Sequence, residues 1–532
     1  MPACPGFSPI DWPVAPDRLA ALAPAATRVP LLVAGGVLGA LAYPLTDWWP
    51  LAWVWLVPAL LSALALPPRA AFRDAWLEGT VFFVLLLRWL DHTFRNYSAI
   101  PWPLTWLPIV LLAAYCGLYV GAAGAWVAWV RARLGPGWAL ATVAPLWVGG
   151  EWLRGWLMDG FPWGLAGYSQ HGVLPVIQIA ELTGVYGVSF LLVAVNCGLA
   201  ALVALGWARA LPGLVLTGAL VLGALVFGWS ALGRVPAPGS QVRVAVIQPN
   251  IAQTLKWDPA RHAEVMDVYE ALTREAARPV EVTDQTSRPA VVIWPETAAT
   301  IFLRGDPALL GRLERLAAEL RMPLVVGSVD RRESPRTQFL NSAFFLTGQG
   351  ITAKYDKIHL VPFGEYVPLA WLIGFVRSWA EFISDFGAGE KATIMPLDHA
   401  RFGVVICYEI IFPDLFRRGV TAGAAFMANI TNDAWFGETS GPWQHLATVP
   451  LRAVENRVAI ARAANTGVSA FVDPSGRVRK MLTIGERGVL ADRLPLRQRE
   501  TLYARWGDWF VYACLALATG TAGLTFFRRS SC

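Results

Sequence analysis

A cysteine, a glutamate and a lysine each stand at the end of an apolar, strand-like run of this sequence. These residues are Cys407, Glu296 and Lys357. A thiolate attacks a carbonyl carbon, a carboxylate takes up the thiol proton, and an ammonium group stabilises the negative oxygen that forms. The three residue types are therefore the parts of an acyl-transfer site.

The local sequence indicates how the reactivity of the carboxylate, the thiol and the lysine is set. Trp294 and Pro295 give Glu296 an apolar approach, which would desolvate the carboxylate and make it a better base. Cys407 precedes a predicted helix start at 411–413, whose dipole would favour the thiolate. Lys357, with a backbone N–H beside Cys407, would hold the oxyanion. Glu365 would fix the lysine or the nucleophile in place.

Each assignment has a simpler alternative. Cys407 alone is also typical of a buried strand cysteine, Glu296 of a helix cap, and Lys357 of a solvated strand-end charge. Three such ends within one segment favour the functional interpretation. Glu365 and Glu409 remain open to a second interpretation, as structural ion-pair partners.

Two other kinds of site are disfavoured. A papain-like pair needs His359 or His445 beside Cys407, but the residues around Cys407 do not have the papain pattern, and we expect His445 to lie near a helix start. No His, Cys and Asp group has the spacing of metal ligands, so the sequence predicts neither a metal nor another cofactor.

The segment that carries these residues alternates short apolar strands with amphipathic helices, which predicts one layered α/β domain. A linker at 235–240 precedes it. Strands are predicted at 242–247, 290–294, 323–329, 342–347, 351–357, 402–407, 424–430, 468–473 and 488–492, and helices at 258–278, 306–320, 412–420 and 443–464. The closely spaced strands before and after 348–350 predict a hairpin.

The rest of the chain has the composition of a membrane protein. Of 532 residues, 55% are hydrophobic, 15% are charged and 26 are tryptophan. Apolar runs, of roughly the 20 residues that cross a bilayer, lie at 29–46, 49–66, 75–91, 104–130, 137–151, 182–206, 211–232 and 507–527. We therefore predict about eight spans, with a seven-helix membrane domain at 1–232, a catalytic domain at 233–506, and a last helix with its tail at 507–532.

The arginines predict the orientation of these spans. With the first end in the cytoplasm, the loops inside hold Arg18, Arg28, Arg69, Arg73, Arg131, Arg133, Arg209, Arg528 and Arg529, and the short loops outside hold Arg95 and Arg154. Because cytoplasmic loops are enriched in Lys and Arg, both termini are expected to be cytoplasmic and 233–506 periplasmic, in a bacterial inner membrane. This pattern accounts for part of the net charge of +6 without a nucleic-acid partner.

The cysteines fit this orientation. Cys116, Cys197 and Cys514 fall in apolar spans, and Cys4 and Cys532 at the cytoplasmic ends. Cys407 is then the one thiol in the oxidising compartment, without a partner for a disulfide. Residues 1–30 carry no cleavable signal peptide that the pattern supports, and the first span would direct insertion.

The same motifs resemble the nitrilase superfamily of carbon–nitrogen hydrolases, which have a Glu-Lys-Cys triad and an α-β-β-α sandwich. More narrowly, the chain resembles the bacterial apolipoprotein N-acyltransferase family over essentially its full length. The resemblance is carried by 248–251, 256–257, 294–297, 360–368, 406–409, 429–437 and 441–445, and in the membrane half by 151–156, 160–163 and 167–170.

The resemblance implies a two-step reaction. Cys407 would take an acyl chain from the sn-1 position of a phospholipid, typically phosphatidylethanolamine, as a thioester. The α-amine of an apolipoprotein's S-diacylglyceryl cysteine would then take the chain from Cys407. Glu296 would be the base and Lys357 the oxyanion partner, with Tyr408 or its backbone assisting.

The resemblance also assigns supporting residues, and it leaves other functions to be weighed. Asn341, Glu365, Tyr408 and Glu409 would surround the triad, and Trp257 and Trp435 would bind substrate, although an exposed Trp257 packed on a lid is the simpler interpretation. Residues 369–386 would form a lipid-facing arm or an ordinary core helix. The alternative functions are a membrane-anchored amidase of the same superfamily, in which water resolves the thioester, and a transporter with a degenerate nitrilase domain. The spans lack the paired charges of an ion pathway, which disfavours the transporter.

Overall fold

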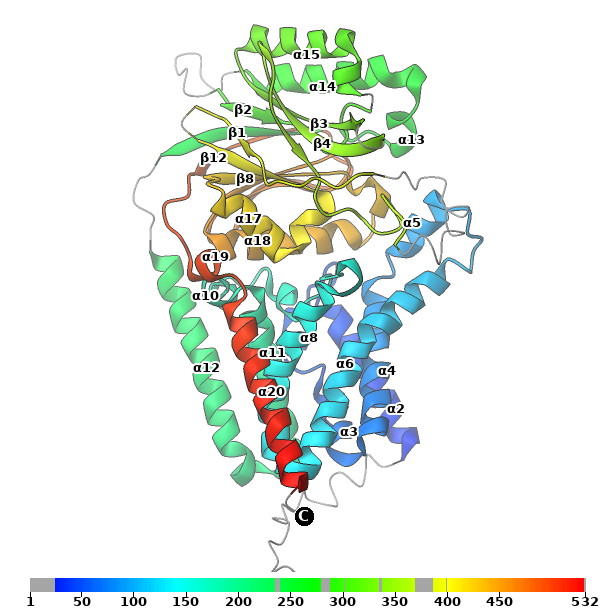
Figure 1. The fold of residues 1–532 in the computed structure, drawn as a ribbon, viewed down its shortest axis with the longest axis vertical. Helices are drawn as coiled ribbons and strands as arrows, with labels where there is room; N and C mark the ends of the chain where they lie inside the picture. Colours follow the sequence, from blue (N-terminus) through cyan, green and yellow to red (C-terminus); the bar gives the residue numbers. More distant parts are fainter. Residues whose placement is uncertain are drawn as a thin grey trace, which may run out of the picture.

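The computed structural model describes residues 24–234, 240–278, 288–300, 302–333, 337–368, 386–398 and 400–530. A bundle of apolar helices forms one end of the molecule and a layered α/β part forms the other (Figure 1). The proposed arm at 369–386 lies almost wholly outside the described residues.

Each of the eight apolar runs contains helix. The main helices are α2 (Ala25–Leu41), α3 (Val57–Ala65), α4 (Pro68–Leu86), α6 (Trp106–Leu134), α8 (Val143–Arg154), α11 (Val185–Leu205), α12 (Trp207–Gly233) and α20 (Trp509–Ser530). Within the described ranges, four helices are long and apolar enough to cross a membrane, namely Trp106–Leu134, Val185–Leu205, Trp207–Gly233 and Trp509–Phe527. The chain thus has several membrane-type helices, and the count of eight spans stays a prediction.

Small residues allow α4 and α6 to pack closely. A Cβ atom added at Gly124 of α6 would lie 2.6 Å from the Ala71 carbonyl oxygen, and one added at Gly79 of α4 would lie 2.7 Å from Val120. Because lipid tails are as apolar as leucine, such close backbone approach is what holds helices together inside a bilayer.

The α/β part contains two mixed six-stranded sheets. The first has the order β12-β1-β2-β3-β4-β5 and the second β11-β10-β9-β8-β7-β6. The strands of the first sheet are β1 (Gln241–Gln248), β2 (Val291–Ile293), β3 (Leu324–Arg332), β4 (Gln338–Thr347), β5 (Gly350–Asp356) and β12 (Gly488–Pro495). Those of the second are β6 (Ile394–Met395), β7 (Phe402–Ile406), β8 (Phe426–Thr431), β9 (Ile460–Ala464), β10 (Ser469–Val472) and β11 (Val478–Leu482).

The sheets face each other across an apolar core that includes Val244, Ile293, Phe402 and Ile406. Helices α14 (His262–Ala276) and α15 (Pro307–Leu320) cover the outer face of the first sheet, and α17 (Pro413–Thr421) and α18 (Gly441–Asn456) cover the second (Figure 1). The α17–α18 layer is the one that faces the helix bundle (Figure 1). Elements that follow the second sheet's strands are thereby placed next to the membrane helices.

Two local predictions have clear outcomes. The hairpin is confirmed, because β4 and β5 pair antiparallel. The single helix at 443–464 is wrong. Helix α18 ends at Asn456, where Arg457 takes a left-handed conformation with φ of 48°, and Ile460 begins β9 between β8 and β10. The pattern of a buried apolar run is equally compatible with a helix and with a strand. Only pairing with neighbouring strands decides which of the two forms.

Candidate active site

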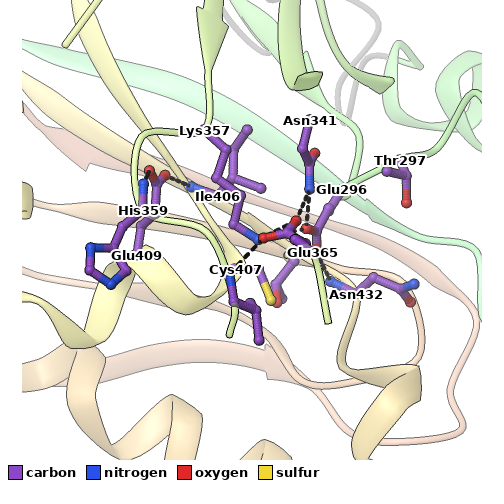
Figure 2. A network of polar contacts seen from close by, with 12 residues as sticks. Glu296, Thr297, Asn341, Lys357, His359, Glu365, Ile406, Cys407, Glu409 and Asn432 are labelled. Atoms are coloured by element: carbon purple, nitrogen blue, oxygen red, sulfur yellow. Dashed lines mark hydrogen bonds and ion pairs between the residues drawn. The ribbon is translucent and has the colours of Figure 1, made fainter. Parts of the chain in front are cut away.

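Three strand ends bring Glu296, Lys357 and Cys407 together between the two sheets (Figure 2). Strand β2 leads to Glu296 and β5 to Lys357, both in the first sheet, whereas β7 leads to Cys407 in the second. All three side chains are buried. Such a site keeps water out and strengthens the interactions between its charges.

Two carboxylates share the lysine. Nζ of Lys357 lies 2.9 Å from Oε1 of Glu365 and 3.4 Å from Oε1 of Glu296. Asn341 donates from Nδ2 to both carboxylates, at 2.7 Å to Glu296 and 2.9 Å to Glu365. The lysine is therefore held mainly by Glu365, which leaves Glu296 less tied to it.

The second oxygen and the backbone of Glu296 are also fixed. The N–H of Asn432 donates to Oε2 at 2.9 Å. Nζ of the buried Lys256 donates to the carbonyl oxygen of Glu296 at 2.9 Å and to the Thr297 hydroxyl at 2.7 Å. Burial lowers the pKa of Lys256 to about 7, although the charges of Glu296 and Cys407 oppose this. Glu296 is thus held by hydrogen bonds on both of its carboxylate oxygens.

Charge and burial shift the pKa values of Lys357 and Cys407 in defined directions. Burial disfavours the Lys357 ammonium, but the carboxylates of Glu365 and Glu296 outweigh it and raise the pKa of this lysine, so it stays charged. Burial and the charge of Glu296 raise the pKa of the Cys407 thiol, and Lys357 only partly offsets this. The contribution of a helix dipole to the thiolate stays a prediction, and burial together with the charge of Glu296 sets the direction of the shift. The surroundings of Cys407 thus favour its neutral thiol over the thiolate.

Cys407 sits on a strained turn that Glu409 ties to the lysine strand. Its φ is 52°, a left-handed conformation that costs a non-glycine residue of order 1–3 kcal/mol. The Glu409 carboxylate accepts from the N–H of Ile406 at 2.6 Å, next to the cysteine, and from the N–H of Ile358 at 2.6 Å, next to the lysine. The N–H of His359 and the hydroxyl of Tyr355 also donate to it. Glu409 thus holds the nucleophile and the lysine at a fixed spacing.

The aromatic residues assigned from the sequence lie less centrally. The Tyr408 hydroxyl donates to the Gly160 carbonyl oxygen at 3.3 Å, so this side chain contacts the segment between α8 and α11. Trp257 is 41% exposed at the end of the short helix α13 (Gln253–Lys256). Trp435 packs edge-on against Tyr97, with ring centroids 4.8 Å apart. The Tyr408 hydroxyl is thus engaged by Gly160.

Two neighbours of the site were missed in the sequence. The burial of Lys256 is not marked in the sequence, because a lone lysine before a tryptophan carries no signal of burial. The predicted position of His445 near a helix start is confirmed, since it lies in the first turns of α18, but its contact with the cysteine backbone is not marked in the sequence. Its Nε2 is 3.2 Å from the Cys407 carbonyl oxygen. The contact with the carbonyl, rather than with the sulfur, separates this pair from a papain-like Cys–His site.

Comparison with known proteins gives matches over both halves of the chain. The family described as apolipoprotein N-acyltransferase N-terminal domain matches residues 35–198, and the carbon-nitrogen hydrolase family matches residues 243–502. The apolipoprotein N-acyltransferase of Geobacter metallireducens is 39% identical, covering 94% of this chain and 95% of that protein. That of Azotobacter vinelandii is 34% identical, covering 92% and 94%. An amidase structure from Nesterenkonia is 22% identical, with a TM-score of 0.36, covering 49% of this chain and 92% of that one.

Proposed function

Since the chain belongs to the apolipoprotein N-acyltransferase family, we propose that it moves an acyl chain from a phospholipid to the N-terminal amine of an S-diacylglyceryl-cysteine apolipoprotein. The observation that carries this proposal is the buried cluster of Glu296, Lys357 and Cys407 at the strand ends. The second sheet, which carries Cys407, is covered by the α17–α18 layer, and this layer faces the apolar helix bundle (Figure 1). A site so placed can be reached by substrates whose tails stay in lipid.

In the first half-reaction, Cys407 forms a thioester. Sγ attacks the ester carbonyl carbon at the sn-1 position while Glu296 takes the thiol proton. The Lys357 ammonium and the Tyr408 N–H stabilise the tetrahedral oxyanion. The carbon–oxygen bond then breaks, and Glu296 returns the proton to the leaving lysophospholipid.

In the second half-reaction, an amine replaces the thiol. The neutral α-amine of the diacylglyceryl cysteine attacks the thioester, Glu296 takes a proton from the nitrogen, and the carbon–sulfur bond breaks. The proton returns to Sγ, so the enzyme regains its resting state and the lipoprotein carries a third acyl chain. No cofactor is needed, because every proton and bond is accounted for by these groups.

The donor and the orientation are parts of the same proposal. Phosphatidylethanolamine is proposed as the donor from the family resemblance. The arginine pattern supports a multi-pass protein of the bacterial inner membrane, with residues 233–506 in the periplasm and both termini in the cytoplasm. Alkaline phosphatase, fused after residue 240, would then be active, and the same fusion after residue 532 inactive. The reverse result would contradict this orientation.

The intact mass of the purified full-length protein tests the reaction. After incubation with phosphatidylethanolamine vesicles, we expect one added acyl chain that hydroxylamine removes, and subsequent loss of that chain when a diacylglyceryl peptide is added. Cys407→Ala should remain folded and inserted but should gain no chain and make no triacylated peptide. Triacylation by this variant at the wild-type rate would refute the assignment. Release of free fatty acid, with no acylated peptide, would point to the amidase alternative.

A further inference from the structure

His445 is a buried imidazole next to the nucleophile that the proposed reaction does not use. It is 0% exposed, and its Nε2 lies 3.2 Å from the carbonyl oxygen of Cys407. Nδ1 lies 3.0 Å from Oδ1 of Asp433 and 3.1 Å from an Nη atom of Arg462. The rings of Trp163 and Phe436 pack against the imidazole. A side chain held on so many sides has a fixed orientation.

The contact of Nε2 with a carbonyl oxygen fixes one proton on the His445 ring. A carbonyl oxygen can only accept, so the contact with Cys407 places a proton on Nε2. Nδ1 lies between an acceptor, Oδ1 of Asp433 at 3.0 Å, and a donor, the Arg462 guanidinium at 3.1 Å, which also donates to Asp433 at 2.7 Å. Burial and the charge of Arg462 lower the pKa of His445, against the opposing effect of Asp433, which favours the neutral ring. In either protonation state, Nε2–H of His445 is a donor aimed at one backbone carbonyl.

The carbonyl that His445 holds belongs to the same peptide unit as the proposed oxyanion donor. The peptide bond between Cys407 and Tyr408 is trans and planar, so its C=O and N–H point in opposite directions. Fixing the carbonyl toward His445 fixes the Tyr408 N–H away from it. The left-handed φ of Cys407 places this peptide unit on a strained turn, where Glu409 holds the preceding N–H and His445 holds the carbonyl.

We infer that His445 is a positioning residue, whose Nε2–H holds the Cys407 carbonyl and thereby aims the Tyr408 N–H at the oxyanion of the acyl-transfer step. The inference deepens the proposed function and rests on it. His445 touches neither the reacting carbon nor the sulfur in this role. Its effect should consequently be confined to reactions that pass through an oxyanion.

Three substitutions of His445 distinguish the role of Nε2 from that of Nδ1. The amide nitrogen of Gln can reach the position of Nε2, whereas that of Asn reaches only the position of Nδ1. His445→Ala and His445→Asn should slow thioester formation by roughly 10- to 100-fold, since losing an oxyanion donor costs about 10²–10³ in rate. His445→Gln should recover most of that loss. Rates are measured by intact mass on the full-length protein, with phosphatidylethanolamine vesicles and separately with p-nitrophenyl hexanoate.

The alkylation rate of Cys407 distinguishes positioning of the oxyanion donor from a general structural role of His445. A general structural role would change this rate as well as the acylation rate. Iodoacetamide reacts with Sγ at a saturated carbon, where no oxyanion forms. All three variants should therefore alkylate Cys407 within about twofold of the wild-type rate while acylation falls. Equal acylation by the Asn and Gln variants, or a parallel loss of alkylation, would overturn the inference.

The two acyl donors distinguish the failure of this inference from that of the proposed function. If the wild-type protein takes an acyl group from p-nitrophenyl hexanoate but not from phospholipid, the proposed lipid donor is refuted. The rates with p-nitrophenyl hexanoate then still decide whether His445 aims the oxyanion donor. If both donors acylate the wild-type protein and the three variants match it, only the inference on His445 fails.

Discussion

At the scale of single residues, the site divides two tasks between two glutamates. Glu365 is the closer partner of Lys357, at 2.9 Å, and so keeps the ammonium charged and in place. Glu296 lies 3.4 Å from the same nitrogen and is oriented by amide donors instead. A carboxylate that is oriented by amides, and not fully neutralised by a close cation, is suited to accept a proton from the thiol.

The raised pKa of Cys407 predicts how its alkylation rate depends on pH. Alkylation by iodoacetamide uses the preformed thiolate, whose fraction grows about tenfold per pH unit below the pKa. We expect the alkylation rate of Cys407 to keep rising from about pH 7 to 10, where an ordinary thiol near 8.5 would level off. Thioester formation should not share this slope if, as proposed, Glu296 takes the proton during attack. The measurement is peptide mass at residue 407.

The Glu296→Gln variant is the matched control for this profile. The charge of Glu296 contributes to raising the pKa of the thiol, so its removal should lower that pKa and speed alkylation at a given pH. The same variant should lose acyl transfer. Opposite changes in the alkylation and acyl-transfer rates of this variant would separate the charge of Glu296 from its role as a base. A plateau in the wild-type alkylation rate below pH 9 would contradict the prediction, since an unshifted thiol titrates near 8.5.

At the scale of elements, Glu409 connects the ends of β5 and β7, one from each sheet. Glu409→Ala would leave one buried N–H group, that of Ile406, and two part-buried ones, those of Ile358 and His359, without this acceptor. An unsatisfied buried donor costs about 1–3 kcal/mol, which applies to the Ile406 N–H, and the two part-buried groups add less because water can reach them. We expect a clear fall in the melting temperature of the detergent-solubilised protein, together with loss of transfer.

Tyr355→Phe provides the comparison. It removes one of the hydrogen bonds to Glu409 and none of the backbone ones. Its melting temperature should stay near that of the wild type and most activity should remain. Similar melting temperatures for the Ala and Phe variants would show that Glu409 does not join the two sheets.

The sequence predicts some elements better than others, for physical reasons. Strands ending at Glu296, Lys357 and Cys407 were predictable, because each strand is a short apolar run with a polar residue at its end. The strand after α18 was not, because Arg457 ends the helix in a left-handed conformation that non-glycine residues rarely adopt. The direction of the Cys407 pKa shift depends on burial between two sheets, and the His445 contact spans 38 residues. Neither is visible in local sequence.

At the scale of the whole molecule, the α17–α18 layer and the helix bundle share one interface. The apolar core cluster that contains Phe416 and Val449 also contains residues of the bundle such as Phe83 and Val188. Polar contacts cross the same interface. These join Tyr168 to Ile411, Trp163 to Gln444, the Val185 N–H to Glu455, and Glu181 to Arg457 and Arg499. The second sheet is thus covered on its outer side by helices that need the bundle to bury them.

This interface predicts that residues 233–506 do not fold as a soluble unit. Excision would expose apolar groups now buried, each worth about 1.5–3 kcal/mol when covered, and would leave Glu455, now 0% exposed, without the Val185 donor. We expect the excised segment to be recovered in the insoluble fraction, whereas the full chain is extracted by detergent and sediments as one species. A monodisperse excised segment whose Cys407 reacts with p-nitrophenyl hexanoate at the full-length rate would contradict this. It would mean that the catalytic geometry is set within the two sheets alone, and that the bundle supplies only the lipid substrates.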